Sequence, residues 1–166
     1  HSAKWAHKSN TFSLQTFVSV NAGIQGLVVE GSARYLSCPI SRKIYPLPSK
    51  VFPRVAVVQS YLDNDGEIIK LVGNSKFDGI VIDGFGAGHV SFEMMDEIKK
   101  LKIPVIVSSR TGSGMCATKT YGYKGSEIDL QDSGCVMSGW LSAIKARLLL
   151  MILIANQVSP QEIKNE

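Results

Sequence analysis

The chain has 166 residues, of which 45% are hydrophobic and 19% are charged, and its formal net charge is +4. This composition is typical of a globular domain with an appendage and excludes an intrinsically disordered chain. The basic residues are scattered without interleaved aromatic residues, so nucleic-acid binding is not expected. The longest apolar run, residues 148–155, is too short to cross a bilayer of ~30 Å, so no membrane association is expected.

The first 38 residues are rich in Ser, Thr, Asn and Gly and contain no long periodic segment. Residues 27–29 (Leu-Val-Val) and 34–36 (Arg-Tyr-Leu) flank residues 30–33 (Glu-Gly-Ser-Ala), which predicts a β-hairpin. Residues 1–38 cannot bury a core of their own, so we expect them to be the C-terminal part of a domain that is mostly absent. Residues 39–53 contain four of the six prolines and are expected to form a linker.

The remainder, residues 54–166, alternates strand and helix signals. Short apolar runs at residues 55–58, 80–82 and 105–107 are typical of strands that are buried on both faces, as in parallel sheets. Their spacing of about 25 residues is that of a βαβ unit. A fourth strand is predicted at residues 134–137. We therefore predict an α/β fold: a small doubly wound, flavodoxin-like parallel sheet of about four strands.

The segments between these runs carry helix signals. Asn64 is an N-cap candidate because a glutamate follows three residues later, and Ser91 is a second candidate. A long helix is predicted at residues 142–157, and it is apolar on more than one stripe, so both its sides should meet protein. Ser159 and Pro160 are expected to occupy the N-cap and N1 positions of a final helix.

Ligands of open parallel sheets bind outside the carboxyl ends of the strands, which points to the loops at residues 59–63, 84–89 and 108–123. The second loop has the pattern G-x-G-x-G, but His89 stands where a dinucleotide-binding fingerprint has its third glycine. We therefore interpret the loop as a tight turn that needs positive φ or the close approach of a neighbouring backbone, and His89 as a polar turn residue. These patterns define an edge of the sheet but no reaction.

Several segments resemble conserved stretches of one family in the same order and at compatible spacing. Residues 1–11 and 17–23 are similar to A-R-W-V-T-K-x-x-T and A-F-x-S-x-N-x-G, residues 79–88 to G-I-V-I-x-G-x-G-x-G, residues 109–114 to S-R-x-G-x-G, and residues 145–151 to K-A-R-x-L-L-M. Together they resemble the bacterial-type L-asparaginase family, with the end of its N-terminal domain followed by its C-terminal domain.

The resemblance implies hydrolysis of L-asparagine to L-aspartate and ammonia, without a cofactor or a metal. In that family a threonine hydroxyl attacks the side-chain amide and forms an acyl-enzyme, with the help of a second threonine, an aspartate and a lysine. Lys8 matches the lysine, which makes it the candidate catalytic residue. The threonine motifs G-G-T and H-G-T-D-T do not occur here. We therefore expect the nucleophile upstream of His1, and this chain alone to be inactive.

The resemblance also implies a homo-oligomer, a homotetramer arranged as a dimer of dimers, in which the C-terminal domain completes the site of a neighbouring subunit. Asp63 matches the position of a substrate-facing asparagine in that family. Tyr121 lies near the position of a glutamate that meets the α-amino group of the substrate. Both are candidate substrate-binding residues, and because both depart from the family pattern, glutamine is a possible second substrate.

Three alternatives stay open. The domain is a flavodoxin-like module that binds an anion or a nucleotide at the glycine loop, or a non-catalytic interaction domain on an asparaginase-like scaffold. An asparaginase-like subunit of a transfer-RNA amidotransferase is the third.

The cysteines and histidines predict neither a disulfide framework nor a metal site. Cys38, Cys116 and Cys135 lack C-x-x-C spacing, so free thiols are expected. His1 and His7 have no acidic or cysteine neighbour at ligand spacing. No signal peptide is visible, but the chain begins with His rather than Met, so we expect its natural N-terminus to be missing. The compartment stays open between the cytoplasm, slightly favoured, and the periplasm or exterior.

Overall fold

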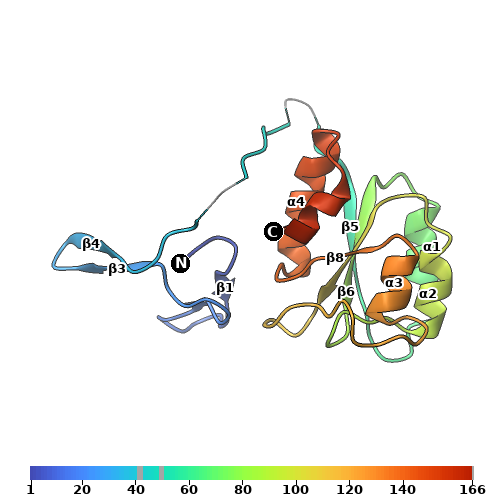
Figure 1. The fold of residues 1–166 in the computed structure, drawn as a ribbon, viewed down its shortest axis with the longest axis horizontal. Coiled ribbons are helices and arrows are strands. Elements are labelled where there is room, and N and C mark those ends of the chain that lie inside the picture. The colour runs from blue at the N-terminus through green and yellow to red at the C-terminus, as the bar shows by residue number, and fades with distance from the viewer. Residues whose placement is uncertain (41–42, 49–50, 166) are drawn as a thin grey trace. The chain divides into compact units, whose positions relative to one another are not determined.

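A computed structural model describes residues 1–40, 43–48 and 51–165 of the chain. They divide into two compact units, His1–Ile44 and Tyr45–Glu166. Figure 1 shows the helices and strands of both units. Of the residues expected to form a linker, 41–42 and 49–50 lie outside the described part of the chain.

The first unit consists of two short antiparallel strand pairs. Strands β1 (His7–Lys8) and β2 (Phe17–Val18) form one pair, and β3 (Gly26–Val29) and β4 (Ser32–Tyr35) form the other. The second pair is the predicted hairpin. Its two turn residues both have positive φ, 50° at Glu30 and 75° at Gly31, which is the backbone of a type I′ turn.

The second unit is built on a parallel four-stranded sheet with the order β5-β6-β7-β8. Its strands are β5 (Val55–Gln59), β6 (Gly79–Gly84), β7 (Val105–Ser109) and β8 (Val136–Met137). The predicted α/β class and the parallel sheet of four strands are thus confirmed. The short apolar runs of the sequence are the two-sided strands of this sheet.

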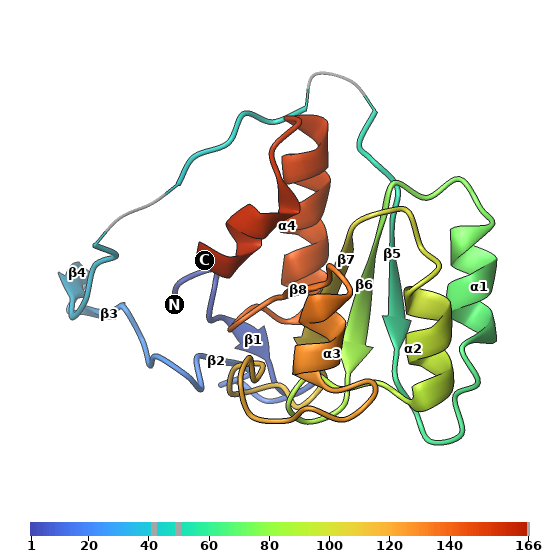
Figure 2. The same ribbon diagram turned by 45° about the vertical axis from the view of Figure 1, so that its right-hand side comes forward.

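Helices cover both faces of the sheet, as Figures 1 and 2 show. One face carries the three crossover helices, α1 (Glu67–Gly73), α2 (Phe92–Ile98) and α3 (Glu127–Asp132). The other face carries the helices that follow β8, namely α4 (Ala143–Ala155) and the 3-10 helix η1 (Pro160–Asn165). Strand neighbours along the chain are neighbours in the sheet, so each crossover is short.

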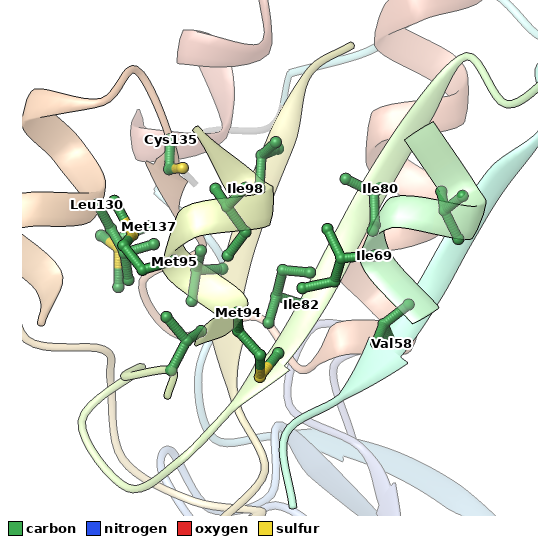
Figure 3. Packing of buried hydrophobic residues seen from close by; sticks show 14 of the residues in the cluster. Val58, Ile69, Ile80, Ile82, Met94, Met95, Ile98, Leu130, Cys135 and Met137 are labelled. Carbon is green, nitrogen blue, oxygen red and sulfur yellow. The ribbon is translucent and has the colours of Figure 1, made fainter. Parts of the chain in front are cut away.

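Alternation along the strands divides the core into two clusters. Ile80 and Ile82 point toward α1 and α2, whereas Val81 between them points toward α4, and all three side chains have an exposed fraction of 0%. Figure 3 shows the first cluster, to which Met94 and Met95 of α2 belong together with Ile80 and Ile82. Burying apolar area at about 25 cal/mol per Å² is what stabilises this three-layer packing.

The beginnings of the helices agree only in part with the sequence. Ser91 is the N-cap of α2 as predicted, and its hydroxyl accepts a hydrogen bond from the backbone N–H of Met94 at 3.1 Å. The prediction of Asn64 as the N-cap of α1 was wrong, because the helix begins two residues later with Gly66 as N-cap. The Asn64 side chain instead closes a turn before the helix by accepting from the N–H of Gly66 at 2.9 Å.

The end of α4 is set by its backbone. The helix stops at Ala155, two residues before the predicted end, because Gln157 adopts positive φ of 57°. The N–H of Val158 then donates to the carbonyl of Leu153, and the N–H of Gln157 donates to that of Ile154. These two bonds form a Schellman motif, with glutamine where glycine is usual. The expected final α-helix is a short 3-10 helix.

Tyr45 and Pro46, which fall in the segment expected to be a linker, belong to the second unit and contact its C-terminal part. The ring of Tyr45 lies against the cluster beneath α4, and Asn156 donates a hydrogen bond to the carbonyl of Pro46 at 2.9 Å.

Within the described residues, no helix has both the length and the apolar character needed to cross a membrane.

Candidate functional site

The loops that follow β5, β6 and β7 meet at the carboxyl edge of the second unit. Arg110, directly after β7, donates through Nη1 to the carbonyl of Ser60 at 2.9 Å, and its N–H donates to the carbonyl of Gly84 at 3.0 Å. Its guanidinium also lies 4.7 Å from the ring centroid of Phe85. One arginine therefore ties all three loops together at this edge.

Asp63, a predicted substrate-binding residue, lies in the loop after β5 with its side chain exposed. Its φ is 65°, in the left-handed region that asparagine and aspartate tolerate better than most residues. The next residue, Asn64, is buried and anchors the turn, and its carbonyl accepts from the hydroxyl of Ser91 at 2.7 Å. Among the described residues, nothing bonds to the Asp63 carboxylate, so the loop presents a free acceptor.

Tyr121, the other predicted substrate-binding residue, lies at the same edge in the long segment between β7 and α3, half exposed. Its backbone N–H donates to the carboxylate of Glu127 at 2.7 Å, and its carbonyl accepts from the hydroxyl of Ser126 at 2.7 Å. Its ring meets the rings of His89 and Tyr123 edge-on, at centroid distances of 5.0 and 6.0 Å. Among the described residues, no hydrogen bond or ring contact joins Tyr121 to Asp63, although both belong to one edge.

A hydrogen-bonded chain of three side chains, which we call the Glu127 chain, was not found from the sequence. Glu127 has an exposed fraction of 0%, and its Oε2 lies 2.8 Å from Nε2 of His89. The Nδ1 atom of the same imidazole lies 2.5 Å from the hydroxyl of Tyr123. The chain thus runs from a buried carboxylate to a phenol that is half exposed at the carboxyl edge.

The environment of Glu127 keeps its carboxylate ionised. Burial acts to raise the pKa of the Glu127 carboxyl, but the N–H groups of Tyr121 and Thr120, its own N–H and His89 outweigh burial, so the pKa is lowered. At the other end of the Glu127 chain, burial and the negative charge of Glu127 raise the pKa of Tyr123. Tyr123 therefore stays a neutral phenol, which fits a hydrogen-bonding role and not that of a nucleophile.

A second carboxylate, Asp83, lies at the end of β6 on the face of the sheet that α4 covers. Ser108 donates to it at 3.2 Å and Gln59 at 3.5 Å, each from the neighbouring strand. Burial raises the pKa of Asp83, against the lowering effects of Ser108, Arg110 and Gln59. Asp83 is thus less acidic than an exposed aspartate.

The glycine loop after β6 forms the predicted tight turn. Gly88 has φ of 93°, and Gly84 is needed because a side chain there would lie 2.9 Å from the carbonyl oxygens of both His89 and Ser108. The N–H groups of Phe85, Gly88 and His89 all donate to carbonyls inside the loop. These three N–H groups are therefore not available to a phosphate, which weighs against a cradle built from the whole loop.

Lys8, the predicted catalytic residue, belongs to the first unit. It lies on β1 opposite Phe17 of β2, and its side chain is exposed. The neighbouring backbone is held by Ser9, whose N–H donates to the carbonyl of Thr16 at 2.8 Å. The strand pair therefore presents the lysine on a fixed backbone.

Among the described residues, no group of three or more His, Cys, Asp and Glu side chains is arranged to hold a metal ion.

The sequence is similar to proteins of known class. The model of the Glutaminase/Asparaginase C-terminal domain matches residues 54–165, which is more than half of the chain. The chain belongs to the glutaminase/asparaginase family. Its relatives include L-asparaginase of Bacillus licheniformis, 28% identical over 93% of this chain and 48% of that protein. L-asparaginase 2 of Escherichia coli is 30% identical over 95% and 46%.

A third relative of the family is a probable periplasmic L-asparaginase of Haemophilus influenzae, 29% identical over 95% of this chain and 46% of that protein. The chain therefore spans about half the length of the curated relatives it matches. Its second unit, Tyr45–Glu166, contains the part that the family model covers. The bacterial-type asparaginase resemblance seen in the sequence is confirmed at the level of the family.

Proposed function

We propose that this chain is part of an L-asparaginase that hydrolyses L-asparagine to L-aspartate and ammonia. The observation that carries the proposal is the family match over residues 54–165 together with relatives named L-asparaginase. The reaction proceeds through a threonine acyl-enzyme, and the threonine lies upstream of His1. A threonine hydroxyl is a weak nucleophile until a neighbouring group takes its proton.

Lys8 is the residue of this chain that handles that proton. A lysine can orient and polarise a hydroxyl network, or act as a base when its ammonium is destabilised by its surroundings. The fixed β1–β2 pairing at Lys8 supports the proposal, because a proton-handling group has to be held within hydrogen-bond reach of its partner. The aspartate and second threonine that complete the group also lie upstream.

The carboxyl edge of the second unit supplies binding groups to the site of a neighbouring subunit. The exposed Asp63 carboxylate and the half-exposed Tyr121 ring support this role, because both lie on loops that Arg110 ties to one edge. Asp63 adds a negative charge where the family has an amide, and Tyr121 lacks the charge of the family glutamate. The enzyme is proposed to be a homotetramer, a dimer of dimers, and to accept glutamine as well.

Ammonia release from L-asparagine by the full-length gene product tests this function. Turnover that requires the threonine upstream supports it, and no turnover with either asparagine or glutamine contradicts it. The 166-residue chain serves as the matched comparison and is expected to release no ammonia above buffer. Turnover by the short chain alone would contradict the assignment of the nucleophile to the upstream part.

A further inference from the structure

For a neutral imidazole, hydrogen-bonding rules set the direction of each hydrogen bond in the Glu127 chain. Oε1 of Glu127 accepts from the backbone N–H groups of Thr120 and Tyr121, at 2.6 and 2.7 Å. Oε2 faces Nε2 of His89 at 2.8 Å. An ionised carboxylate can only accept, so the proton between these two atoms belongs to His89 Nε2.

The tautomer of His89 decides whether the hydroxyl of Tyr123 donates or accepts the hydrogen bond between them. A neutral histidine with its proton on Nε2 has an acceptor at Nδ1, and the group 2.5 Å from Nδ1 is the hydroxyl of Tyr123. The hydroxyl therefore donates inward. Its oxygen lone pairs stay available on the solvent side, where the exposed fraction of Tyr123 is 47%.

We propose that Glu127 and His89 are positioning residues that hold the Tyr123 hydroxyl as a hydrogen-bond acceptor for an N–H donor of an amino-acid amide substrate. The inference rests on the proposed function, because it assigns this edge to substrate. It moves the oriented acceptor from Tyr121, which the sequence favoured, to Tyr123. The Tyr121 hydroxyl makes no hydrogen bond with any described residue, so none of these residues orients its proton.

Substituting Glu127 by its amide, Glu127→Gln, reverses the direction of the hydrogen bonds in the Glu127 chain without changing the shape of the side chain. Two backbone N–H groups demand an acceptor at the Oε1 position, so the amide oxygen takes that place and the NH₂ group faces His89. An NH₂ group can only donate, which moves the imidazole proton from Nε2 to Nδ1. Nδ1–H then donates to Tyr123, whose hydroxyl turns outward as a donor.

Imidazole ¹⁵N chemical shifts of His89 in the 166-residue chain at pH 8 test the relay without any enzymatic assay. We expect a protonated Nε2 and a bare Nδ1 in the wild type, and the reverse in Glu127→Gln. Retained backbone amide shifts outside the loops establish that the variant is folded. A wild-type ring protonated on Nδ1, alone or together with Nε2, would overturn the inference, and so would a folded Glu127→Gln without the reversal.

The role toward substrate is tested by steady-state kinetics of the full-length protein. Tyr123→Phe removes the acceptor and keeps the ring, so KM for L-asparagine should rise about tenfold while kcat stays within about twofold. Glu127→Gln should raise KM similarly, and the double variant should be no worse than Tyr123→Phe, because both changes act on one hydrogen bond. Tyr35→Phe, far along the chain in the exposed hairpin, is the control.

The outcomes separate this inference from the function on which it rests. A wild-type enzyme that turns over asparagine while Tyr123→Phe leaves KM unchanged would overturn the inference alone. Additive effects of Tyr123→Phe and Glu127→Gln would also overturn it, since they would show that Glu127 does not act through Tyr123. A wild type that hydrolyses neither amide would remove the proposed function, and the substrate role of Tyr123 with it.

Discussion

Glu127 is a buried carboxylate whose hydrogen bonds depend on its charge, which makes a part of the stability depend on pH. Against the effect of burial, backbone N–H groups and His89 lower the pKa of Glu127 in the folded state below that of an ordinary glutamate. The stabilisation is therefore complete above the unfolded pKa and is lost as the pH falls through the folded pKa. We predict that the free energy of unfolding of the 166-residue chain, measured by urea denaturation, declines as the pH is lowered below about 4.5.

Glu127→Gln should weaken this dependence. At pH 7 the variant should be less stable by roughly 1–3 kcal/mol, because an amide oxygen replaces a charged acceptor. Its curve should then fall less steeply than that of the wild type below pH 4.5. Asp129 also has a lowered pKa, through its bonds with Lys99 and Gly125 against the effect of burial, and it contributes equally to both proteins. Parallel curves for the two proteins would contradict this account of Glu127.

The three thiols should differ sharply in reactivity. Burial, with the charge of Asp129, raises the pKa of Cys135 to about 12, and burial also raises the pKa of Cys116. Cys38 is exposed. The thiolate is the reactive form of cysteine. We therefore predict that a thiol reagent that releases a coloured product modifies Cys38 quickly in the native chain at pH 8. Cys116 and Cys135 should react only on unfolding. Cys38→Ser should abolish the fast phase, and a fast phase that persists would contradict the burial of the other two.

At the residue scale, the sequence placed its candidate binding residues at the carboxyl edge of the sheet but missed a pair of interacting side chains there. Asp63 and Tyr121 were reached through the family resemblance, and both lie at the carboxyl edge. Glu127 and His89 were missed as a pair because 38 positions separate them and no spacing rule joins them. His89 was interpreted as a polar turn residue, and its backbone does form the turn with Phe85. Only the folded structure shows that its ring also bonds to Glu127 and Tyr123.

At the scale of the elements, α4 is the helix that holds one face of the sheet. Leu150 is fully buried and packs over Gly79, where an added side chain would lie 3.0 Å from its Cδ2 atom. Leu148 is on the outer side of the same helix with an exposed fraction of 52%. The two leucines therefore form a matched pair that differs in burial.

We predict that Leu150→Ala lowers the free energy of unfolding by about 3 kcal/mol, because it removes buried methyl groups and leaves a cavity against the sheet. Leu148→Ala should change it by no more than about 0.5 kcal/mol. Urea denaturation of the 166-residue chain measures both. Equal effects of the two substitutions would mean that α4 does not pack on the sheet through the Leu150 side.

The elements were predictable where one physical signal dominated. The runs at β5, β6 and β7 are apolar on both faces. Their short length and the turn residues beside them favour strands over helices. The start of α1 was misplaced because Asn64 has the composition of an N-cap while its side chain serves the preceding turn. The end of α4 was missed because glutamine at positive φ carries no sequence signal.

At the scale of the whole molecule, the chain covers about half the length of its curated relatives, which are named L-asparaginases. The first unit carries Lys8 and the second carries the edge with Asp63, Tyr121 and the Glu127 chain. In the proposed enzyme, Lys8 serves the threonine of its own subunit, while the edge serves a neighbour. The first part of this proposal makes Lys8 the residue of this chain on which the reaction itself depends.

The turnover number of the full-length Lys8→Ala variant with L-asparagine is the most direct test of the account. Loss of a proton-handling group should lower kcat by about 10²- to 10⁴-fold with the fold intact, as judged by circular dichroism. Lys102 is an exposed lysine at the amino edge of the sheet, away from the carboxyl edge. The kcat of Lys102→Ala should stay within about twofold of that of the wild type. A Lys8→Ala enzyme with near wild-type kcat would contradict the central claim that this lysine takes part in amide hydrolysis.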